Sequence, residues 1–376
     1  MNPAARPSRR IAILLPDLRP GGAERLHVSL ARAWIARGFE VEFVLRQARG
    51  ELMAELPLGA SVFSLNAGRV RRSILPLARY LRSTPPRVLL AAMWPLTAVA
   101  ALSARLGGYR GRVICSEHSP LSLAYARRGA LHRWFLSASQ RWAYPRLDAA
   151  IGVSAGVADD LALTSGLPRK VFTVLHNPAA LGNAGVRTDV PPQLVSAARP
   201  IFLTVGTLKR VKRQDVLIDA FARLAAHGRG TLCILGDGPE RGALAAQVQA
   251  LGLGEAVLMP GFVEDPGPWY ASADLFILSS EYEGFGNVIV EAMEYGLPIV
   301  STDCVAGPSE ILEGGRYGTL VPVGDAEALS EAMQGALVAP IDREALRARA
   351  RDFGLEVVAE RYLDILIPGW RSEVVA

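Results

Sequence analysis

The sequence predicts an α/β protein with two doubly wound, Rossmann-like domains that face each other across a cleft. Its 376 residues are too many for one ordinary core and suit two domains. Apolar, strand-like runs alternate with helix-like patterns in both halves, as parallel sheets with crossover helices require. The pattern breaks at residues 177–200, which are rich in Pro, Gly and polar residues. We therefore expect an N-terminal domain at 1–178, a linker at 179–200 and a C-terminal domain at 201–352.

Short apolar runs and amphipathic stretches place the elements in order. In the first half we expect strands near 11–15, 40–45, 87–91, 111–115, 148–152 and 171–175, and helices near 23–37, 94–106, 130–143 and 154–164. In the second half we expect strands near 201–205, 231–235, 256–259, 274–278, 298–301 and 319–321, and helices near 213–226, 239–251, 287–295 and 325–337. Ligands of such sheets bind beyond the carboxyl ends of the strands, so the segments after each strand are the candidates for a site.

Composition indicates a soluble, globular protein of a reducing compartment. Half of the residues are apolar and a fifth are charged. The three cysteines are far apart and match neither a CxxC pair nor a zinc-ligand spacing, so we expect neither a disulfide framework nor a metal site. The first apolar run, 11–15, is a strand rather than a signal peptide, and the apolar region from Val88 is interrupted by Pro95. We therefore expect a cytoplasmic protein.

The net charge of +5 hides a division between the two halves. Residues 1–178 hold 25 Lys and Arg against 10 Asp and Glu, whereas residues 179–376 hold 16 against 26. A basic half favours phosphate-rich partners such as nucleic acid, an anionic membrane surface or a phosphorylated substrate. The alternative is a solvated basic face that helps to dock the acidic half.

Two segments that follow strands in the first half have chemistry suited to binding. Gly21 and Gly22 open a helix that we expect to begin at Ala23, and the free N–H groups at a helix start can bind an anion. They do not form GxGxxG, so the nicotinamide-cofactor fingerprint is absent here. His118 directly follows a strand and can donate a hydrogen bond to a substrate hydroxyl or phosphate. The alternative for the two glycines is that they serve only the geometry of a turn. The alternative for His118 is an ordinary loop histidine whose hydrogen bonds are made within the protein.

A basic segment follows the strand near 201–205. Four cations, Lys209, Arg210, Lys212 and Arg213, lie within five positions of an otherwise acidic half. Several cationic donors together can stabilise a diphosphate leaving group as charge develops on it. Nucleic acid would use similar residues, but no aromatic residues are interleaved with these cations, so we do not expect a nucleic-acid partner.

The segment "EYEGFGNVIVEA", residues 281–292, places carboxylates on both sides of a Gly-Phe-Gly loop. We expect Asn287 to cap a helix that carries Glu291 about one turn from its start, with Glu283 at the mouth of the loop. The alternative is that both carboxylates are ordinary acids near a helix start that favour the helix dipole. That alternative does not explain the glycines around Phe285. Backbone that a ligand can approach, flanked by acceptors for vicinal hydroxyls, fits a sugar nucleotide better than a metal ion.

"EGFGNVIVE" resembles the E-x7-E motif of the retaining glycosyltransferases of family 4, which adopt the GT-B fold. Further matching motifs follow in order over nearly the whole chain: GGAER, VGTLKRVK, GDGPER, PGFVED, ADLFILSS, GLPIVSTD and GPSEIL. The resemblance implies transfer of a sugar from a nucleotide-diphosphate donor, with a UDP-sugar favoured, and retention of the anomeric configuration. It also implies that residues 353–376 form a C-terminal helix that packs back on the N-terminal domain.

The resemblance implies a role for each matching residue. Glu283 would contact hydroxyls of the donor sugar near the reacting carbon, and Glu291 would hold the nucleotide ribose. The backbone that would face the sugar and diphosphate belongs to Gly284, Phe285, Gly286 and Asn287. The positions of the first domain that would meet the diphosphate and the transferred sugar are Gly21, Gly22 and His118.

Lys212 matches the phosphate-binding lysine of this family. The family usually has an arginine five residues earlier, where this chain has Thr207, so Lys209 or Arg210 would have to supply that charge. The segment whose backbone would border the base is Phe262 and Val263.

No Asp-x-Asp occurs in the chain, so we expect no metal-bridged diphosphate and no cofactor. Cationic side chains and helix N-termini would take the place of the metal. We expect front-face transfer in which the diphosphate accepts the acceptor's proton, while closure across residues 177–200 excludes water. Two alternatives from other classes are a sugar-nucleotide epimerase of the same architecture and a non-catalytic sugar-nucleotide-binding module.

We expect the acceptor to be a saccharide or a lipid-linked molecule of bacterial cell-surface polysaccharide or glycolipid synthesis. Residues 69–82 and 125–146 mix Arg with Trp, Phe, Tyr and Leu, as a helix that lies on anionic lipid does. The protein would then be peripheral at the inner face of the membrane. The alternative places these aromatic residues in the core and the arginines in water.

Overall fold

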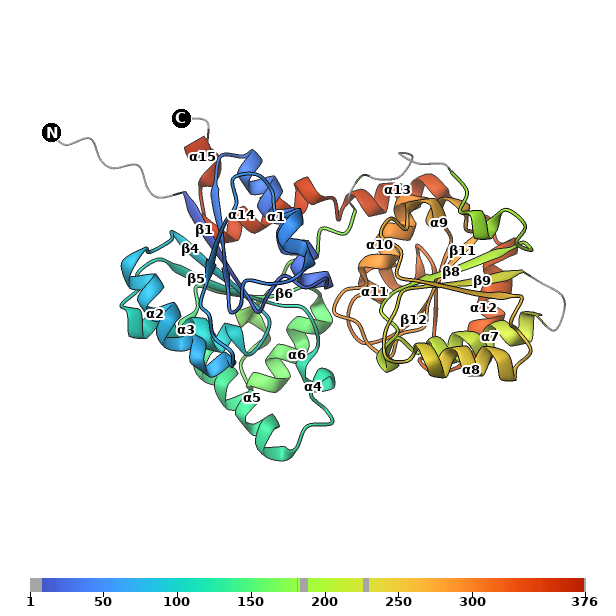
Figure 1. The fold of residues 1–376 in the computed structure, drawn as a ribbon, viewed down its shortest axis with the longest axis horizontal. Coiled ribbons are helices and arrows are strands. Elements are labelled where there is room, and N and C mark those ends of the chain that lie inside the picture. Colours follow the sequence, from blue (N-terminus) through green and yellow to red (C-terminus); the bar gives the residue numbers. More distant parts are fainter. Residues whose placement is uncertain (1–8, 181, 183–188, 226–229, 375–376) are drawn as a thin grey trace. The chain divides into compact units, whose positions relative to one another are not determined.

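The computed structural model describes residues 9–180, 182, 189–225 and 230–374. The chain divides into two compact units: unit 1 holds Met1–Pro178 and Leu355–Ala376, and unit 2 holds Ala179–Gly354. Each unit has one parallel sheet with helices packed on it, which confirms the predicted doubly wound class (Figure 1). Among the residues described, no helix has both the length and the apolar character needed to cross a membrane.

Unit 1 contains a seven-stranded parallel sheet in the order β3-β2-β1-β4-β5-β6-β7. Its strands are β1 (Arg10–Leu15), β2 (Glu40–Leu45), β3 (Ser61–Ser64), β4 (Val88–Ala92), β5 (Arg112–Glu117), β6 (Ala149–Gly152) and β7 (Phe172–Val174). Its helices are α1 (Gly22–Ala36), α2 (Ile74–Ser83), α3 (Leu96–Gly107), α4 (Leu121–Ala124), α5 (Ala130–Ala143), α6 (Ala155–Ser165), α14 (Leu355–Leu366) and α15 (Trp370–Val374). The strand order reverses between β1 and β4.

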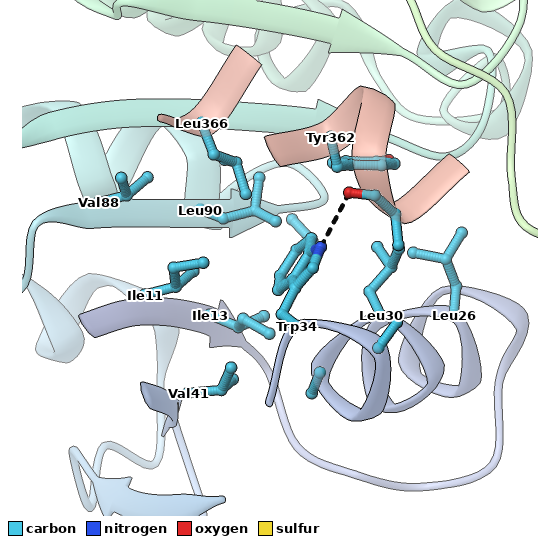
Figure 2. Packing of buried hydrophobic residues seen from close by; sticks show 14 of the residues in the cluster. Ile11, Ile13, Leu26, Leu30, Trp34, Val41, Val88, Leu90, Tyr362 and Leu366 are labelled. Atoms are coloured by element: carbon cyan, nitrogen blue, oxygen red, sulfur yellow. Dashed lines mark hydrogen bonds between the residues drawn. The ribbon is translucent and has the colours of Figure 1, made fainter. Parts of the chain in front are cut away.

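One face of this sheet is covered by α1 together with α14, which are far apart in the sequence. Trp34 of α1 is fully buried, and its Nε1–H donates to the carbonyl of Ala359 in α14 at 3.0 Å (Figure 2). The same apolar cluster includes Ile11 and Leu90 of the strands and Leu366 of α14. The last helices of the chain are therefore part of the core of unit 1.

Unit 2 contains a six-stranded parallel sheet in the order β10-β9-β8-β11-β12-β13. Its strands are β8 (Ile201–Val205), β9 (Thr231–Leu235), β10 (Val257–Gly261), β11 (Leu275–Leu278), β12 (Ile299–Thr302) and β13 (Thr319–Val321). Its helices are α7 (Gln214–Ala225), α8 (Arg241–Ala250), α9 (Gly267–Ser272), α10 (Asn287–Glu294), α11 (Pro308–Ile311), α12 (Ala326–Val338) and α13 (Arg343–Arg351). The order reverses between β8 and β11, and a doubly wound sheet binds its ligands at the carboxyl ends of such strands.

Candidate active site

The loops that follow β8 and β11 are joined at the point where the sheet of unit 2 reverses its order. The backbone N–H of Glu281 donates to the carbonyl of Val211 at 2.7 Å. The hydroxyl of Ser279 donates to the carbonyl of Lys212 at 2.8 Å. These bonds fix the basic loop after β8 against the acidic loop after β11.

Lys212 and Glu283 form an ion pair at this junction. Nζ of Lys212 lies 2.6 Å from Oε1 of Glu283, and the hydroxyl of Ser280 donates to the same oxygen, also at 2.6 Å. Glu283 is buried and Lys212 is half-buried. Two donors hold the carboxylate in one orientation, and the ammonium lies where it can neutralise charge on a phosphate. Sequence motifs predicted both residues but not their direct contact.

The other predicted cations of the basic segment lie in different surroundings. Arg213 adopts a left-handed conformation with φ of 48° and donates from Nε to Asp215 at 3.0 Å. Thr207, Lys209 and Arg210 have exposed side chains. Of the four cations, Lys212 is therefore the one that the structure places against Glu283.

The Gly-Phe-Gly loop is anchored in the core by its aromatic residue. Phe285 is buried, and its ring lies 5.3 Å from that of Phe353 in an edge-to-face arrangement. A Cβ at Gly307 would come within 1.7 Å of the carbonyl oxygen of Phe285, so the following loop packs tightly here. Gly286 has φ of 100°, a conformation that favours glycine. It occupies the N-cap of α10, so the prediction that Asn287 caps this helix is wrong, and Asn287 is its first residue.

Glu291 lies one turn into α10 and has a different partner from Glu283. Its Oε2 accepts a hydrogen bond of 2.8 Å from the hydroxyl of Tyr270 in α9. Burial and the neighbouring Glu291 raise the pKa of Tyr270, so the hydroxyl stays protonated and donates. Tyr270 in turn stacks on Tyr295, with ring centroids 5.5 Å apart. Sequence reasoning missed Tyr270 because α9 is too short to show a helical pattern.

In unit 1, the predicted anion seat is the first turn of α1. The helix begins at Gly22 rather than at the expected Ala23, and Gly21 is its N-cap. A Cβ at Gly21 would come within 2.3 Å of Oε2 of Glu24, so this carboxylate lies at the helix start. Its negative charge complements the positive end of the helix dipole.

His118 follows β5 and contacts a second histidine that sequence reasoning missed. The rings of His118 and His27 are 5.4 Å apart and nearly perpendicular. Nε2 of His118 lies 3.1 Å from Oγ of Ser116, and Nδ1 of His27 donates to the carbonyl of Ala23 at 2.7 Å. Burial lowers the pKa of both histidines, so both rings are neutral at pH 7. His27 contacts His118 because it lies on the buried face of α1. The sequence has no other feature that relates the two residues.

Glu117, the residue before His118, is a buried acceptor for three donors. They are the backbone N–H of Trp94 at 2.8 Å, the hydroxyl of Thr97 at 2.9 Å and the hydroxyl of Tyr144 at 3.3 Å. Burial raises the pKa of Glu117 to about 7. This network holds the turn after β4 against β5.

Phe262 and Val263, the segment predicted to border the base, follow β10. Phe262, just beyond β10, has 65% of its surface exposed, and Val263 is half-buried. Within the described parts of the chain, no group of three or more His, Cys, Asp or Glu side chains is arranged to hold a metal ion.

Two family descriptions match most of the chain. Residues 187–353 match the family described as Glycosyl transferases group 1, and residues 20–181 match Glycosyltransferase Family 4. The lipopolysaccharide core biosynthesis glycosyltransferase LpsE of Rhizobium meliloti is 29% identical over 361 residues, which are 93% of this chain and 96% of LpsE. An N-acetylgalactosaminyltransferase of Campylobacter jejuni, named for a diphospho-undecaprenol acceptor, is 28% identical over 67% of each chain.

Solved structures share the fold over nearly the whole length. HepE of Anabaena, solved in complex with UDP and glucose, has a TM-score of 0.76 and 20% identity over 95% of this chain and 99% of that chain. WaaG, a glycosyltransferase involved in lipopolysaccharide biosynthesis, has a TM-score of 0.70 and 19% identity over 96% of this chain and 100% of that chain. Both likenesses concern the fold.

Proposed function

This chain belongs to the family 4 glycosyltransferases of the GT-B fold, and we propose that it transfers a sugar from a nucleotide-diphosphate donor, with a UDP-sugar favoured. It acts in lipopolysaccharide or polysaccharide biosynthesis, as its relatives LpsE and WaaG do. The acceptor is a saccharide or a lipid-linked molecule. The UDP and glucose bound to HepE, and the diphospho-undecaprenol in the name of the Campylobacter relative, support these substrate classes.

The observation that carries the proposal is the Lys212 to Glu283 pair at the switch point of unit 2. In the proposed reaction the bond between the anomeric carbon and the diphosphate oxygen breaks. A new bond forms from that carbon to the acceptor oxygen on the same face, and the acceptor's proton passes to the departing diphosphate. Lys212 stabilises the negative charge that develops on the diphosphate, and Glu283 orients the sugar hydroxyls. The proposed reaction uses no metal ion.

Transfer is tested with the purified chain, a panel of sugar nucleotides and lipid-linked or lipopolysaccharide acceptors. We expect nucleotide release that depends on the acceptor, continues in EDTA and gives a product with the donor's anomeric configuration by NMR. Conversion of the donor without an acceptor would favour an epimerase, and binding without any conversion would favour a non-catalytic module.

Glu291 provides a matched test of the donor site. Glu291→Ala removes the acceptor proposed for the ribose hydroxyls, so we expect UDP affinity to fall by about 10- to 100-fold, since hydrogen bonds to charged groups contribute about 1.5–3 kcal/mol. Tyr270→Phe leaves the carboxylate but removes its 2.8 Å donor, so we expect a smaller loss. Unchanged affinity in both variants, measured by calorimetry, would refute the assignment of Glu291.

We also propose that unit 1 meets an anionic membrane through α5 and the turn before it. Leu131, Trp134 and Phe135 lie on adjacent turns of α5 and are 80%, 66% and 55% exposed. Arg127, Arg128 and Arg133 beside them are exposed too, and residues 121–146 contain no acidic residue. An apolar face bordered by cations is typical of a helix that binds an anionic lipid surface.

The second segment considered for this role, residues 69–82, supports it less. Leu77, Tyr80 and Leu81 of α2 are buried in the core of unit 1, and Leu75 is its exposed large apolar side chain. For this segment, most of the aromatic and apolar residues therefore serve packing.

A further inference from the structure

The stretch of unit 1 that contains α2 and α3 is strongly basic and has no acidic residue of its own. Residues 56–116 hold nine arginines and no Asp or Glu. From residue 72 on, five of these arginines have exposed side chains and, among the described residues, no carboxylate partner: Arg72, Arg79, Arg82, Arg105 and Arg110. We call these five the α2–α3 face. Arg87, in the same stretch, does pair with Glu373, at 2.6 Å.

The spacing of these arginines and the packing of the two helices make the face continuous. Arg72 lies in the 3-10 turn that leads into α2. Arg79 and Arg82 follow Arg72 by seven and ten residues, so all three lie on one side of the helix. Nη2 of Arg82 donates to the carbonyl of Leu106 at 3.0 Å, beside Arg105 in α3. The two helices pack side by side (Figure 1).

A surface of this kind lowers the stability of the isolated protein, because like charges repel and a soluble surface normally mixes both signs. Arg82 and Arg105 lie in the last turns of α2 and α3, where a cation complements the helix dipole. That explanation does not extend to Arg72, Arg79 or Arg110. A guanidinium is always charged, and its forked donors match a carboxylate or a phosphate. A partner that carries such groups would neutralise the face.

Two observations narrow the class of anionic partner. Between residues 69 and 110, the exposed large apolar side chains are Leu75 and Leu106, which offer little area to enter a lipid layer. No described aromatic side chain in this range is exposed, so no ring is placed to stack on nucleic-acid bases. Recognition by charge, without insertion or stacking, fits a hydrated saccharide that bears carboxylates or phosphates.

We propose that the α2–α3 face binds the anionic part of the saccharide acceptor. The inference rests on the proposed function and names the chemical class of the acceptor, a glycan that carries carboxylate or phosphate groups. Because α2 follows β3, the face begins near the carboxyl edge of the sheet, where open sheets bind their ligands. A glycan whose reacting end lies at that edge extends along α2 over its arginines.

The test measures, by calorimetry and without donor, the dissociation constant of a short oligogalacturonate, which has a carboxylate on each sugar. Its methyl ester of the same length is the neutral reference. The wild type binds the acid at least about tenfold more tightly than the ester at low salt, and high salt removes this preference by screening. The variant Arg72→Gln/Arg79→Gln/Arg105→Gln weakens binding of the acid at least about fivefold. Phosphorylated oligomannose and its phosphatase-treated form, measured in the same way, distinguish phosphate from carboxylate as the preferred group.

The matched control removes the same charge from another part of unit 1. Arg127→Gln/Arg128→Gln/Arg133→Gln replaces exposed arginines beside α5, and it changes the affinity for the charged glycan by less than about threefold. Flotation with anionic vesicles gives the reverse pattern, since the arginines beside α5 are the ones proposed to meet lipid. The control variant then floats less than the wild type, and the variant of the face floats as the wild type does.

The outcomes separate this inference from the proposed function. Equal binding of the charged and neutral forms of both glycans, or an equal loss in the two triple variants, overturns the role of the face. Tighter binding of single-stranded DNA of the same length would assign the face to nucleic acid, and loss of flotation in the variant of the face alone would assign it to the membrane. The proposed function fails separately, when no donor releases its nucleotide with any acceptor, because glycan binding is measured without donor.

Discussion

Lys212 is the single residue on which turnover is expected to depend most. Its Nζ is held 2.6 Å from Glu283 in the loop after β8, beside the position proposed for the leaving diphosphate. Lys212→Ala removes a preorganised positive charge, so we expect kcat to fall by about 100- to 1000-fold with a smaller change in KM. Nucleotide release at saturating donor measures this. Turnover close to wild type in a folded Lys212→Ala protein would contradict the proposed role.

His27 makes stability depend on pH in a predictable direction. Burial lowers the pKa of His27 from 6.5 to about 4 in the folded state. As the pH falls from 6.5 to 4, the unfolded chain binds a proton that the folded chain does not, so the free energy of unfolding decreases by about 3 kcal/mol in total. In His27→Leu we expect a smaller decrease between pH 7.5 and pH 5, measured by urea titration. The same decrease in both proteins would contradict this account.

Glu117 changes the free energy of unfolding with pH in the opposite direction from His27. The effect of His27 is therefore taken from the difference between wild type and His27→Leu. Burial raises the pKa of Glu117 from 4.5 to about 7. Its contribution to stability is complete below pH 4.5 and is lost as the pH rises through 7. Both proteins contain Glu117, so its contribution cancels in the difference between wild type and His27→Leu.

At the scale of elements, α14 stabilises unit 1 through its apolar face. Tyr362 of this helix lies in the buried apolar cluster of unit 1 (Figure 2). Leu363 is buried as well, and the hydroxyl of Tyr362 has no partner among the described residues. Leu363→Ala leaves a cavity and should lower the free energy of unfolding by about 2–5 kcal/mol. Tyr362→Phe removes an unsatisfied hydroxyl and should raise it by about 1 kcal/mol. Urea unfolding measures both changes. Equal losses of unfolding free energy in Leu363→Ala and Tyr362→Phe would show that the hydroxyl of Tyr362 has a hydrogen-bond partner.

Most of the strands could be predicted because parallel strands are buried on both faces and appear as continuous apolar runs. β3 escaped prediction because it is an edge strand, Ser61–Ser64, with mostly exposed side chains. α13 escaped because only Leu346 and Ala350 are buried among its arginines and glutamate. Both elements are stabilised by their neighbours rather than by a pattern of their own.

Prediction of the candidate site from the sequence had the same limit, because contacts between elements have no sequence pattern of their own. Motifs predicted Glu283 and Lys212 separately, but they are 71 residues apart, and only the adjacency of β8 and β11 brings them together. His27 and Tyr270 carry no motif, since their surroundings arise from packing between elements. Motifs therefore identified Glu283 and Lys212 as candidate site residues, but they did not identify the residues that pack around the candidate site.

At the scale of the whole molecule, the division of charge predicts where the protein binds. Residues 1–178 carry a large excess of basic residues, and their exposed apolar side chains on α5 lie among arginines. Each basic residue near an anionic lipid surface contributes about 1 kcal/mol, and this attraction weakens as salt screens it. We therefore expect binding to anionic vesicles at low salt, less binding at high salt and little binding to zwitterionic vesicles.

Flotation of a triple variant separates the apolar contribution of α5 from the general charge of unit 1. Replacing Leu131, Trp134 and Phe135 by serine keeps every arginine but removes the side chains that would enter the lipid, so the partition coefficient should fall at least about tenfold. Leu163→Ser is the matched control, because Leu163 is exposed in α6 outside this face. A wild-type protein that stays in solution with anionic vesicles at low salt refutes membrane binding. Equal flotation of the triple variant would instead assign the binding to charge alone, since the arginines beside α5 are unchanged.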